Sequence, residues 1–212
     1  MSFTVLRTLA VGGHALVLGH GEGSLDALHA RERSLLSPRA TVARARDFVG
    51  GRLAAKAALA ARFGAGEWII ERATGEHEGA PIVHGPAQAS VSISHTDGFA
   101  IAIAGPAPAA IDLVKLEPLP ESLCEEAFTS AERRAWALSG EPLAMTVAFA
   151  AKEAALKWLR VGMGTPLHSV RVMPRRYDAI DVETDALRAT LRACTLTHDA
   201  WLAFVLLERS PS

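Results

Sequence analysis

The sequence has few cysteines and almost no net charge, and each of these excludes whole classes of protein. Only Cys124 and Cys194 occur among its 212 residues, which is too few for a disulfide framework and lacks the spacing of a zinc site. This usage suits a reducing compartment, so we expect a cytoplasmic protein. The 22 Lys and Arg residues nearly balance the 23 Asp and Glu residues, and the formal net charge is -1. We therefore expect no general attraction to nucleic acid or to an anionic membrane.

Long apolar runs are also missing. A membrane-spanning helix needs about 18 or more uncharged apolar residues, whereas the longest candidate, residues 98–111, is shorter and contains Pro106 and Pro108. Near the N-terminus, Arg7 precedes an apolar run over residues 9–18, which is the order found in secretory signals. Two glycines and a histidine interrupt that run, so we expect a first strand there and not a signal peptide.

The composition is otherwise that of a globular chain, with half of the residues apolar and 21% charged. Helical spacing of apolar residues predicts helices over residues 24–33, 40–63, 121–138 and 143–161. Alternating or short apolar runs predict strands within residues 2–18, 68–72, 91–94, 99–104, 111–114, 169–173, 189–196 and 201–207. The dipeptide Asp97-Gly98 predicts a hairpin turn, and residues 75–86 are expected to form a loop. The predicted class is α+β.

A connector with two prolines, Gly105–Ala109, separates two stretches of similar make-up. We therefore expect two similar α/β subdomains, residues 1–105 and 106–212, in a pseudo-twofold arrangement.

Charge is distributed unevenly along the chain. Residues 31–62 contain eight basic residues against two acidic ones, and residues 112–153 contain eight acidic residues against four basic ones. Each segment by itself is compatible with a solvated helix face. The presence of both favours a site for a metal-bound polyphosphate, which needs a divalent cation on one side and basic groups on the other.

Three positions stand out as candidates for chemistry. His95 closes a predicted strand beside a turn, where it could reach a ligand or simply face water. Asp112 lies between Ile and Leu in a predicted buried strand, and a carboxylate there is costly unless it is paired or binds a metal. Glu153 and Lys157 share one helix face, either as a surface ion pair or as a metal ligand beside a group that contacts phosphate.

Five motifs, in this order and spacing, resemble the surfactin-type 4′-phosphopantetheinyl transferases. They are Gly51–Lys56, Ser92–Thr96, Ala110–Leu113, Phe128–Glu132 and Phe149–Lys157. The resemblance covers roughly residues 25 to 165, and its most specific part is the Lys-Glu-Ala helix followed by a further lysine. It implies the fold of that family and a holo-carrier-protein synthase. Such an enzyme transfers phosphopantetheine from coenzyme A to a serine of an acyl or peptidyl carrier protein with magnesium, and it releases adenosine 3′,5′-bisphosphate.

The resemblance also implies roles in the second half of the chain. Asp112 and Glu153 would hold the metal on the pyrophosphate, and Glu132 would be a further acidic residue of the metal site. Lys157 would contact the transferring phosphate and could assist the leaving group. Glu153, acting directly or through a metal-bound water, is the candidate base for the serine hydroxyl, because phosphoryl transfer asks mainly for charge neutralisation, alignment and a proton acceptor.

In the first half, the resemblance implies a binding site for coenzyme A. His95 would bind its 3′-phosphate, with Ser94 beside it and Arg52 and Lys56 as basic neighbours. We expect these groups to face the metal residues across a cleft between the two halves.

Four positions depart from the family pattern. Ala110 replaces a glycine, Phe149 replaces the commonest tryptophan, Val114 replaces an acidic residue, and Ala80 replaces a lysine that would meet a coenzyme A phosphate. These departures leave an alternative open, a non-catalytic relative that binds coenzyme A or a carrier protein. For either function we expect a monomer.

Overall fold

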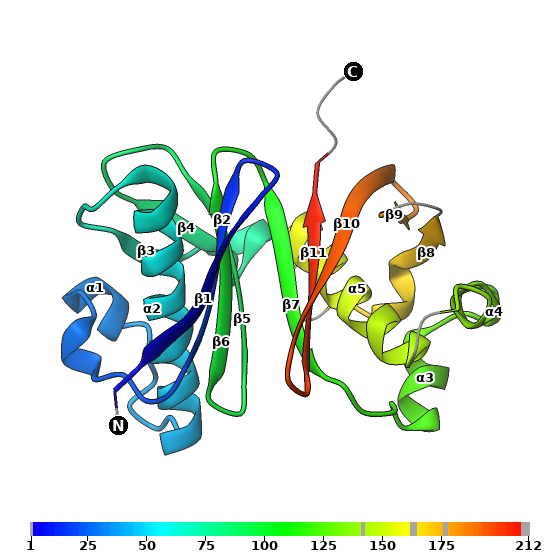
Figure 1. The fold of residues 1–212 in the computed structure, drawn as a ribbon, viewed down its shortest axis with the longest axis horizontal. Helices are drawn as coiled ribbons and strands as arrows, with labels where there is room; N and C mark the ends of the chain where they lie inside the picture. The colour runs from blue at the N-terminus through cyan, green and yellow to red at the C-terminus, as the bar shows by residue number, and fades with distance from the viewer. Residues whose placement is uncertain (1, 141–142, 162–164, 176–177, 209–212) are drawn as a thin grey trace. The chain divides into compact units, whose positions relative to one another are not determined.

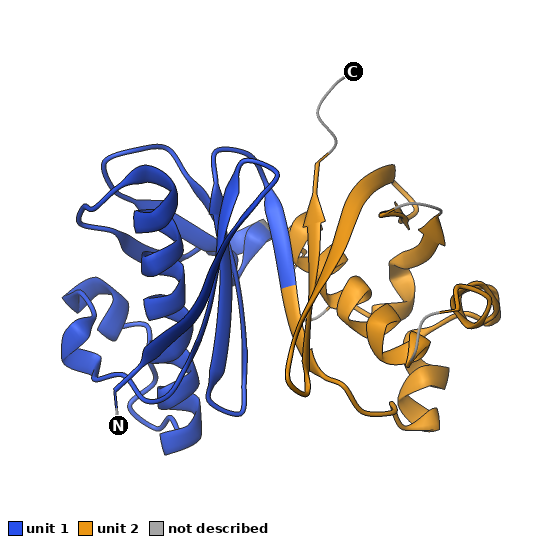
Figure 2. Cartoon of the chain, viewed as in Figure 1, with its two compact units in different colours: residues 1–111 blue, residues 112–212 orange. Residues whose placement is uncertain are grey.

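The computed structural model of the chain describes residues 2–140, 143–161, 165–175 and 178–208. The chain divides into two compact units, residues 1–111 and 112–212 (Figure 2). Each unit combines helices with a β-sheet (Figure 1), which confirms the predicted α+β class.

Unit 1 contains a four-stranded sheet of order β1-β2-β6-β5, a separate β3-β4 pair and one long helix. Its elements are β1 (Thr4–Val11), β2 (His14–His20), the 3-10 helix η1 (Leu25–Ala27), α1 (Ala30–Arg33), α2 (Val42–Phe63), β3 (Ile69–Arg72), the 3-10 helix η2 (Gly75–His77), β4 (Pro81–His84), β5 (Ser90–Thr96) and β6 (Phe99–Gly105). Helix α2 packs on β2, β5 and β6.

Helix α2 confirms the prediction of a long helix in this region. Thr41 caps its N-terminus by accepting a hydrogen bond from the backbone N–H of Arg44, and Gly64 ends it with a φ of 95°. Its buried face is rich in alanine and meets alanines of β6 in one apolar cluster. Small side chains on both surfaces let the helix lie close to the sheet.

The hairpin predicted at Asp97-Gly98 is confirmed. Both residues adopt left-handed backbone angles, with φ of 49° and 80°, and β5 and β6 pair antiparallel on either side of them. Two left-handed residues in a two-residue loop match the twist of the paired strands.

Unit 2 contains a five-stranded sheet of order β7-β11-β10-β9-β8. Its elements are β7 (Ala109–Lys115), which begins in unit 1, α3 (Glu121–Ala127), α4 (Ser130–Ala137), α5 (Ala144–Leu159), the 3-10 helix η3 (Leu167–Ser169), β8 (Arg171–Arg175), β9 (Ala179–Glu183), β10 (Arg188–His198) and β11 (Trp201–Leu207). Helix α5 packs on β8 and β11, and α4 packs on β8 and α5.

Three predicted elements differ from the structure, and one strand was not predicted. The helix predicted over residues 24–33 is only η1 and α1, and the helix predicted over residues 121–138 is two helices. The second break occurs because Phe128 is extended and buried while Thr129 caps a new helix. Strand β4 lies within the predicted loop over residues 75–86, because its residues pair with β3. Strand β9 was not predicted, since its five residues carry few large apolar side chains.

Helix α5 ends at Leu159, and its C-cap residue Arg160 adopts a left-handed conformation with a φ of 54°. Gly162 and Gly164, whose positions suggested the end of this helix, lie outside the described residues. Within the described part of the chain, both cysteines are free. No described helix is long and apolar enough to cross a membrane.

Candidate active site

Strand β7 and helix α5 carry three of the four residues predicted to act in unit 2, which are Asp112, Glu153 and Lys157. Asp112 is buried in β7, and its Oδ1 accepts a hydrogen bond from the Nζ of Lys157 at 2.7 Å. Lys157 therefore forms an ion pair with a residue outside its own helix. Its ammonium reaches across to the sheet, which joins helix and strand at this point.

Glu153 lies one turn before Lys157 on α5 and is half-buried. The pKa of its carboxyl lies above the ordinary value, because burial disfavours the charged form. The negative charge of Asp112 raises this pKa further, whereas the positive charge of Lys157 lowers it. The two carboxyl groups are thus close enough to repel each other, and the Lys157 ammonium partly offsets their charge.

This donor set fits a magnesium ion. Two carboxylates and one ammonium leave one net negative charge, and magnesium is commonly held by one or two carboxylates together with water and substrate phosphates. Val114 is two residues after Asp112 and thus on the same face of β7, but it offers no oxygen ligand. In the described ranges, no three His, Cys, Asp or Glu side chains form a group that could hold a metal.

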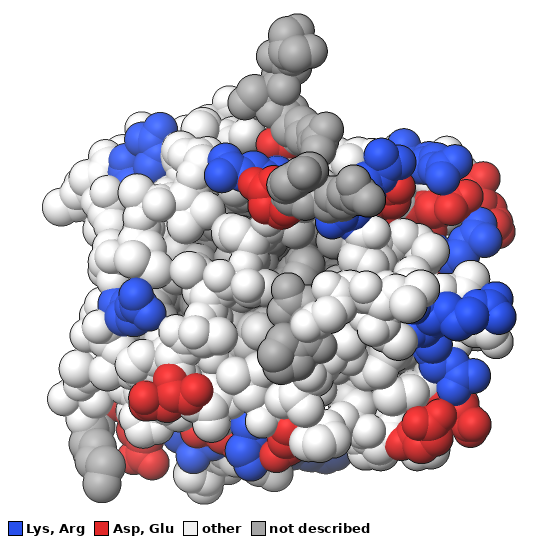
Figure 3. All heavy atoms as spheres, turned by 45° about the vertical axis from the view of Figure 1, so that its right-hand side comes forward, with Lys and Arg blue, Asp and Glu red and all other residues white. Residues whose placement is uncertain are grey.

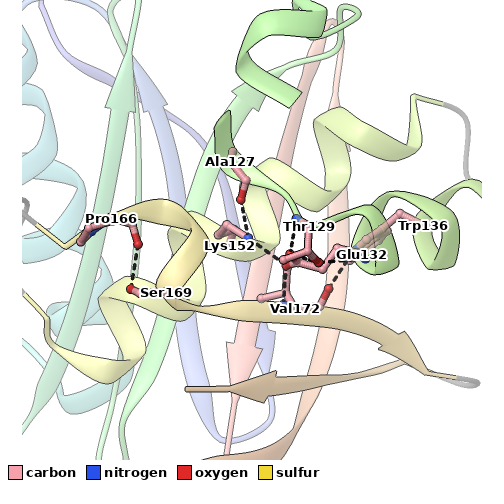
Figure 4. Close-up of polar contacts among 8 residues, drawn as sticks. All are labelled: Ala127, Thr129, Glu132, Trp136, Lys152, Pro166, Ser169 and Val172. Atoms are coloured by element: carbon pink, nitrogen blue, oxygen red, sulfur yellow. Dashed lines mark hydrogen bonds and ion pairs between the residues drawn. The ribbon is translucent and has the colours of Figure 1, made fainter. Parts of the chain in front are cut away.

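Glu132, the third residue predicted at the metal site, has a different environment (Figure 4). Its side chain is 0% exposed, and its Oε1 accepts bonds from the Nζ of Lys152 at 2.8 Å and the backbone N–H of Val172 at 2.9 Å. Its Oε2 accepts bonds from the backbone N–H and the hydroxyl of Thr129, each at 2.9 Å. Both oxygens are already used inside unit 2, so the geometry gives Glu132 a structural position and not that of a ligand.

Lys152 completes this buried arrangement. Its ammonium donates to Glu132 and to the backbone oxygen of Ala127 at 2.6 Å and lies 4.6 Å from the ring centre of Phe128. Burial lowers the pKa of Lys152, although the bond to Glu132 works in the opposite direction. Because Lys152 immediately precedes Glu153, this contact fixes the rotation of the helix that carries the candidate base.

In unit 1, Arg52 of α2 is a buried cation. Its guanidinium lies 3.6 Å from the ring centre of Phe48, and its Nε is buried and has no hydrogen-bond partner within the described residues. Burial lowers the pKa of Arg52 to about 10, and the positive charges of Arg72 and Arg44 contribute, while Glu32 opposes them. A cluster of mutually repelling guanidinium groups is stabilised by any anion that binds among them.

His95 faces the same helix. A Cβ added at Gly51 would lie 3.2 Å from the Cδ2 of His95 and 2.9 Å from a methyl group of Ile93. Because Gly51 has no side chain, α2 approaches β5 closely, and the imidazole of His95 lies beside the first residue of the Gly51–Lys56 motif. Successive residues of a strand point to opposite faces, so the buried Ser94 lies on the face of β5 opposite His95. Since His95 faces α2, Ser94 lies on the face of the strand that points away from the helix carrying Arg52.

Lys56, the other predicted basic neighbour, has its own acidic partner. Its Nζ donates to the Oε2 of Glu32 at 2.5 Å, and the Glu32 side chain is 0% exposed. The ammonium is thereby directed at a buried carboxylate of unit 1.

Sequence reasoning missed Glu32, Arg44 and Arg72. The signal that could have found Glu32 is the capping box. In this motif, the side chain of the third helical residue accepts a hydrogen bond from the backbone N–H of the N-cap residue. Such a box begins at His29 and a second one begins at Thr129. Arg44 and Arg72 carry no local signal, since their proximity to Arg52 depends on how α2 and β3 pack.

Charge at the surface is more mixed than the sequence suggested. Acidic and basic side chains interleave on the face shown in Figure 3. Exposed ion pairs in unit 2 contribute to this pattern, among them Arg133–Glu121 at 3.1 Å and Arg171–Glu183 at 3.1 Å. Much of the acidic segment of residues 112–153 therefore belongs to solvated helix faces, and Asp112 and Glu153 are its members near the Lys157 ammonium.

Comparison with known protein families gives two matches that together cover most of the chain. A model described as the 4′-phosphopantetheinyl transferase superfamily matches residues 108–205. A model described as the 4′-phosphopantetheinyl transferase N-terminal domain matches residues 31–105. No curated protein matches the sequence.

Proposed function

The chain belongs to the 4′-phosphopantetheinyl transferase superfamily, and we propose that it is a magnesium-dependent, surfactin-type enzyme that modifies a serine of an acyl or peptidyl carrier protein. The donor of the phosphopantetheine group is coenzyme A. The observation that carries the proposal is the meeting of Asp112, Glu153 and Lys157 between β7 and α5. In the proposed enzyme, this arrangement would supply ligands for a cation, a proton acceptor and a positive charge for a phosphate within one unit.

Asp112 and Glu153 would hold the magnesium ion, which neutralises charge on the pyrophosphate of coenzyme A. The serine oxygen forms a bond to the phosphorus that carries the pantetheine arm, and the bond from this phosphorus to the oxygen of the nucleotide breaks. The serine proton passes to Glu153, whose raised pKa makes it a better acceptor than an ordinary carboxylate. Lys157 stabilises the charge that develops on the transferring phosphate, and adenosine 3′,5′-bisphosphate leaves.

In unit 1, Arg52 and His95 are proposed to bind the 3′-phosphate of coenzyme A. Arg52 contributes a guanidinium whose Nε has no hydrogen-bond partner among the described residues. Its partly desolvated charge favours a doubly charged phosphate over water. The cytoplasmic location and monomeric state predicted from the sequence are part of this proposal.

The proposal is tested by measuring both products of one reaction. Incubation with coenzyme A, magnesium and an apo carrier protein is expected to release adenosine 3′,5′-bisphosphate in equal amount to the modified carrier. Chromatography quantifies the nucleotide and mass spectrometry the carrier. Coenzyme A binding without release of the nucleotide, across a broad panel of carriers, would favour the non-catalytic relative.

Replacing Arg52 by methionine is expected to weaken coenzyme A binding about 10- to 100-fold, because the guanidinium is lost while the apolar stem over Phe48 is kept. Isothermal titration calorimetry measures this affinity. Arg39→Ala, which removes an exposed arginine outside α2, is the matched control and should bind normally. Unchanged affinity in Arg52→Met would exclude Arg52 from the phosphate site.

Replacing Val114 by glutamate is expected to lower the magnesium concentration for half-maximal rate about threefold or more, since it adds a carboxylate on the Asp112 face of β7. The measurement is a magnesium titration of the initial transfer rate. Val114→Gln introduces a side chain of the same shape as glutamate but without its charge, so it should not lower the magnesium concentration for half-maximal rate. An equal effect of both variants would contradict a metal site at this face.

A further inference from the structure

Each unit contains one fully buried glutamate in the same local structure. Glu32 is the third residue of α1 and Glu132 is the third residue of α4, and both are 0% exposed. Each accepts a bond from the backbone N–H of its own N-cap residue at 2.9 Å, from His29 in unit 1 and from Thr129 in unit 2. The two short helices therefore begin in the same way.

The other partners of the two glutamates also correspond. Glu32 accepts a bond from the backbone N–H of Ile70 at 3.2 Å, and Glu132 accepts one from Val172 at 2.9 Å. Ile70 is the second residue of β3 and Val172 is the second residue of β8. The sequence separations between carboxylate and strand are 38 and 40 residues.

A lysine of the following long helix completes both arrangements. Lys56 of α2 donates to Glu32 at 2.5 Å, and Lys152 of α5 donates to Glu132 at 2.8 Å. One carboxylate thus joins a helix start, a long helix and a strand in each unit. We call each of these a buried joint, the Glu32–Lys56 joint in unit 1 and the Glu132–Lys152 joint in unit 2.

The units also repeat the order of their elements. In both, a short capped helix is followed by a long helix, a pair of strands and a final hairpin. No sequence repeat reveals this correspondence, because the joints retain only a glutamate and a lysine at unequal spacing.

Each long helix carries candidate site residues at fixed angles from its joint lysine. Glu153 follows Lys152 directly, and one residue of an α-helix turns the side chain by about 100°. With Lys152 held by Glu132, the position of Glu153 around the helix is also fixed, and the charge of Asp112 acts on its carboxyl. In α2, Arg52 lies four residues before Lys56 and shares its face, so the contact with Glu32 also determines where the Arg52 guanidinium lies.

We propose that Lys56 and Glu32 are positioning residues, which hold the Arg52 guanidinium where it binds coenzyme A. In the same way, Lys152 and Glu132 hold Glu153 and Lys157 in the positions needed for transfer. That coenzyme A is the ligand of Arg52 rests on the proposed function. Lys56 then acts through α2 and does not contact coenzyme A itself. The two joints are separable, since one supports binding and the other supports the reaction step.

The test compares single and double variants at each joint. Lys56→Met and Lys152→Met each leave a buried carboxylate without its cation, whereas Glu32→Gln/Lys56→Met and Glu132→Gln/Lys152→Met remove both charges. Lys115→Met replaces an exposed lysine paired with Glu117 and is the matched control. Three quantities are measured: the thermal unfolding midpoint, coenzyme A affinity by calorimetry, and the transfer rate as a function of magnesium.

Each lysine variant is expected to lower the unfolding midpoint by about 10 °C, because breaking a buried pair leaves an unpaired charge. Lys56→Met should weaken coenzyme A binding about tenfold with little change in kcat, since Arg52 contributes to binding. Lys152→Met should lower kcat about tenfold or more and raise the magnesium requirement, with coenzyme A affinity little changed. Each double variant should recover part of both losses, because no unpaired charge remains to displace the helix. Recovery is incomplete because the glutamine NH2 group replaces one carboxylate oxygen, and both oxygens accept backbone N–H bonds.

Two outcomes overturn the proposal. If Glu32→Gln/Lys56→Met binds coenzyme A as weakly as Lys56→Met does, Lys56 contacts the ligand itself. If the lysine single variants are less stable than the wild type but have normal coenzyme A affinity and normal kcat, the joints stabilise the fold without positioning the site residues. Failure of the wild-type protein to bind coenzyme A would instead overturn the proposed function. The joints would then be judged from unfolding alone, where double variants that are no more stable than the lysine single variants contradict them.

Discussion

Replacing Asp112 by alanine is expected to abolish transfer, with a loss of about 10³-fold or more in rate even at saturating magnesium. Asp112 contributes one of the two carboxylates proposed to hold the magnesium ion, and Val114 cannot take its place. Removing it leaves Glu153 as a single carboxylate beside the Lys157 ammonium, so the local charge becomes neutral and no longer attracts a divalent cation. The measurement is the initial rate of carrier modification by mass spectrometry over a range of magnesium concentrations.

Two further variants make the Asp112 result specific. Asp112→Asn keeps the size of the side chain and its place in β7, and it should lose activity to a similar extent if the charge is what matters. Glu117→Ala removes an exposed carboxylate paired with Lys115 at 2.9 Å and should be as active as the wild type. Normal activity in Asp112→Ala would show that the assigned metal site is wrong.

Replacing Lys157 by alanine is expected to lower the transfer rate by about two to four powers of ten while changing coenzyme A affinity much less. The ammonium interacts more strongly with the transferring phosphate as charge develops on it, so its loss falls mainly on the transition state. If Lys157 only made a partly exposed ion pair with Asp112, its removal would cost about 1 kcal/mol of stability or less and would leave the rate nearly unchanged.

The Lys157 comparison needs calorimetry of coenzyme A binding beside carrier modification for the same two proteins. Lys157→Arg retains the positive charge and should keep part of the activity, which a variant that merely unfolds would not. Lys115→Ala serves as the surface control. Equal transfer rates for wild type and Lys157→Ala would remove Lys157 from the mechanism.

Local patterns predicted the elements that hold the site. Helix α2 and the hairpin of β5 and β6 were predicted because helical spacing and an Asp-Gly turn are short-range signals. The pairing of Asp112 with Lys157 was not predicted from spacing, since the two residues are 45 positions apart in sequence. The resemblance to a family grouped them, but only the packing of α5 on its sheet shows the contact.

The same limit explains the residues whose predicted roles the geometry does not support. Motif position grouped Glu132 with the metal ligands and Lys56 with the phosphate-binding groups, although each residue is bonded inside its own unit. Ser94 was grouped with His95 because the two are adjacent in sequence, yet adjacency in a strand places side chains on opposite faces. A sequence motif gives the residue type and its spacing, whereas a role also depends on partners that only folding brings near.

The central claim is that this chain transfers phosphopantetheine, and intact-mass spectrometry of the acceptor tests it most directly. A panel of apo acyl and peptidyl carrier proteins is incubated with the chain, coenzyme A and magnesium, with parallel reactions that contain a chelator or carriers whose acceptor serine is replaced by alanine. The account predicts that at least one carrier gains the mass of a single phosphopantetheine group, only with magnesium and only when the serine is present. If the protein binds coenzyme A, and this binding weakens in Arg52→Met, but every carrier keeps its original mass, the claim of transfer is wrong.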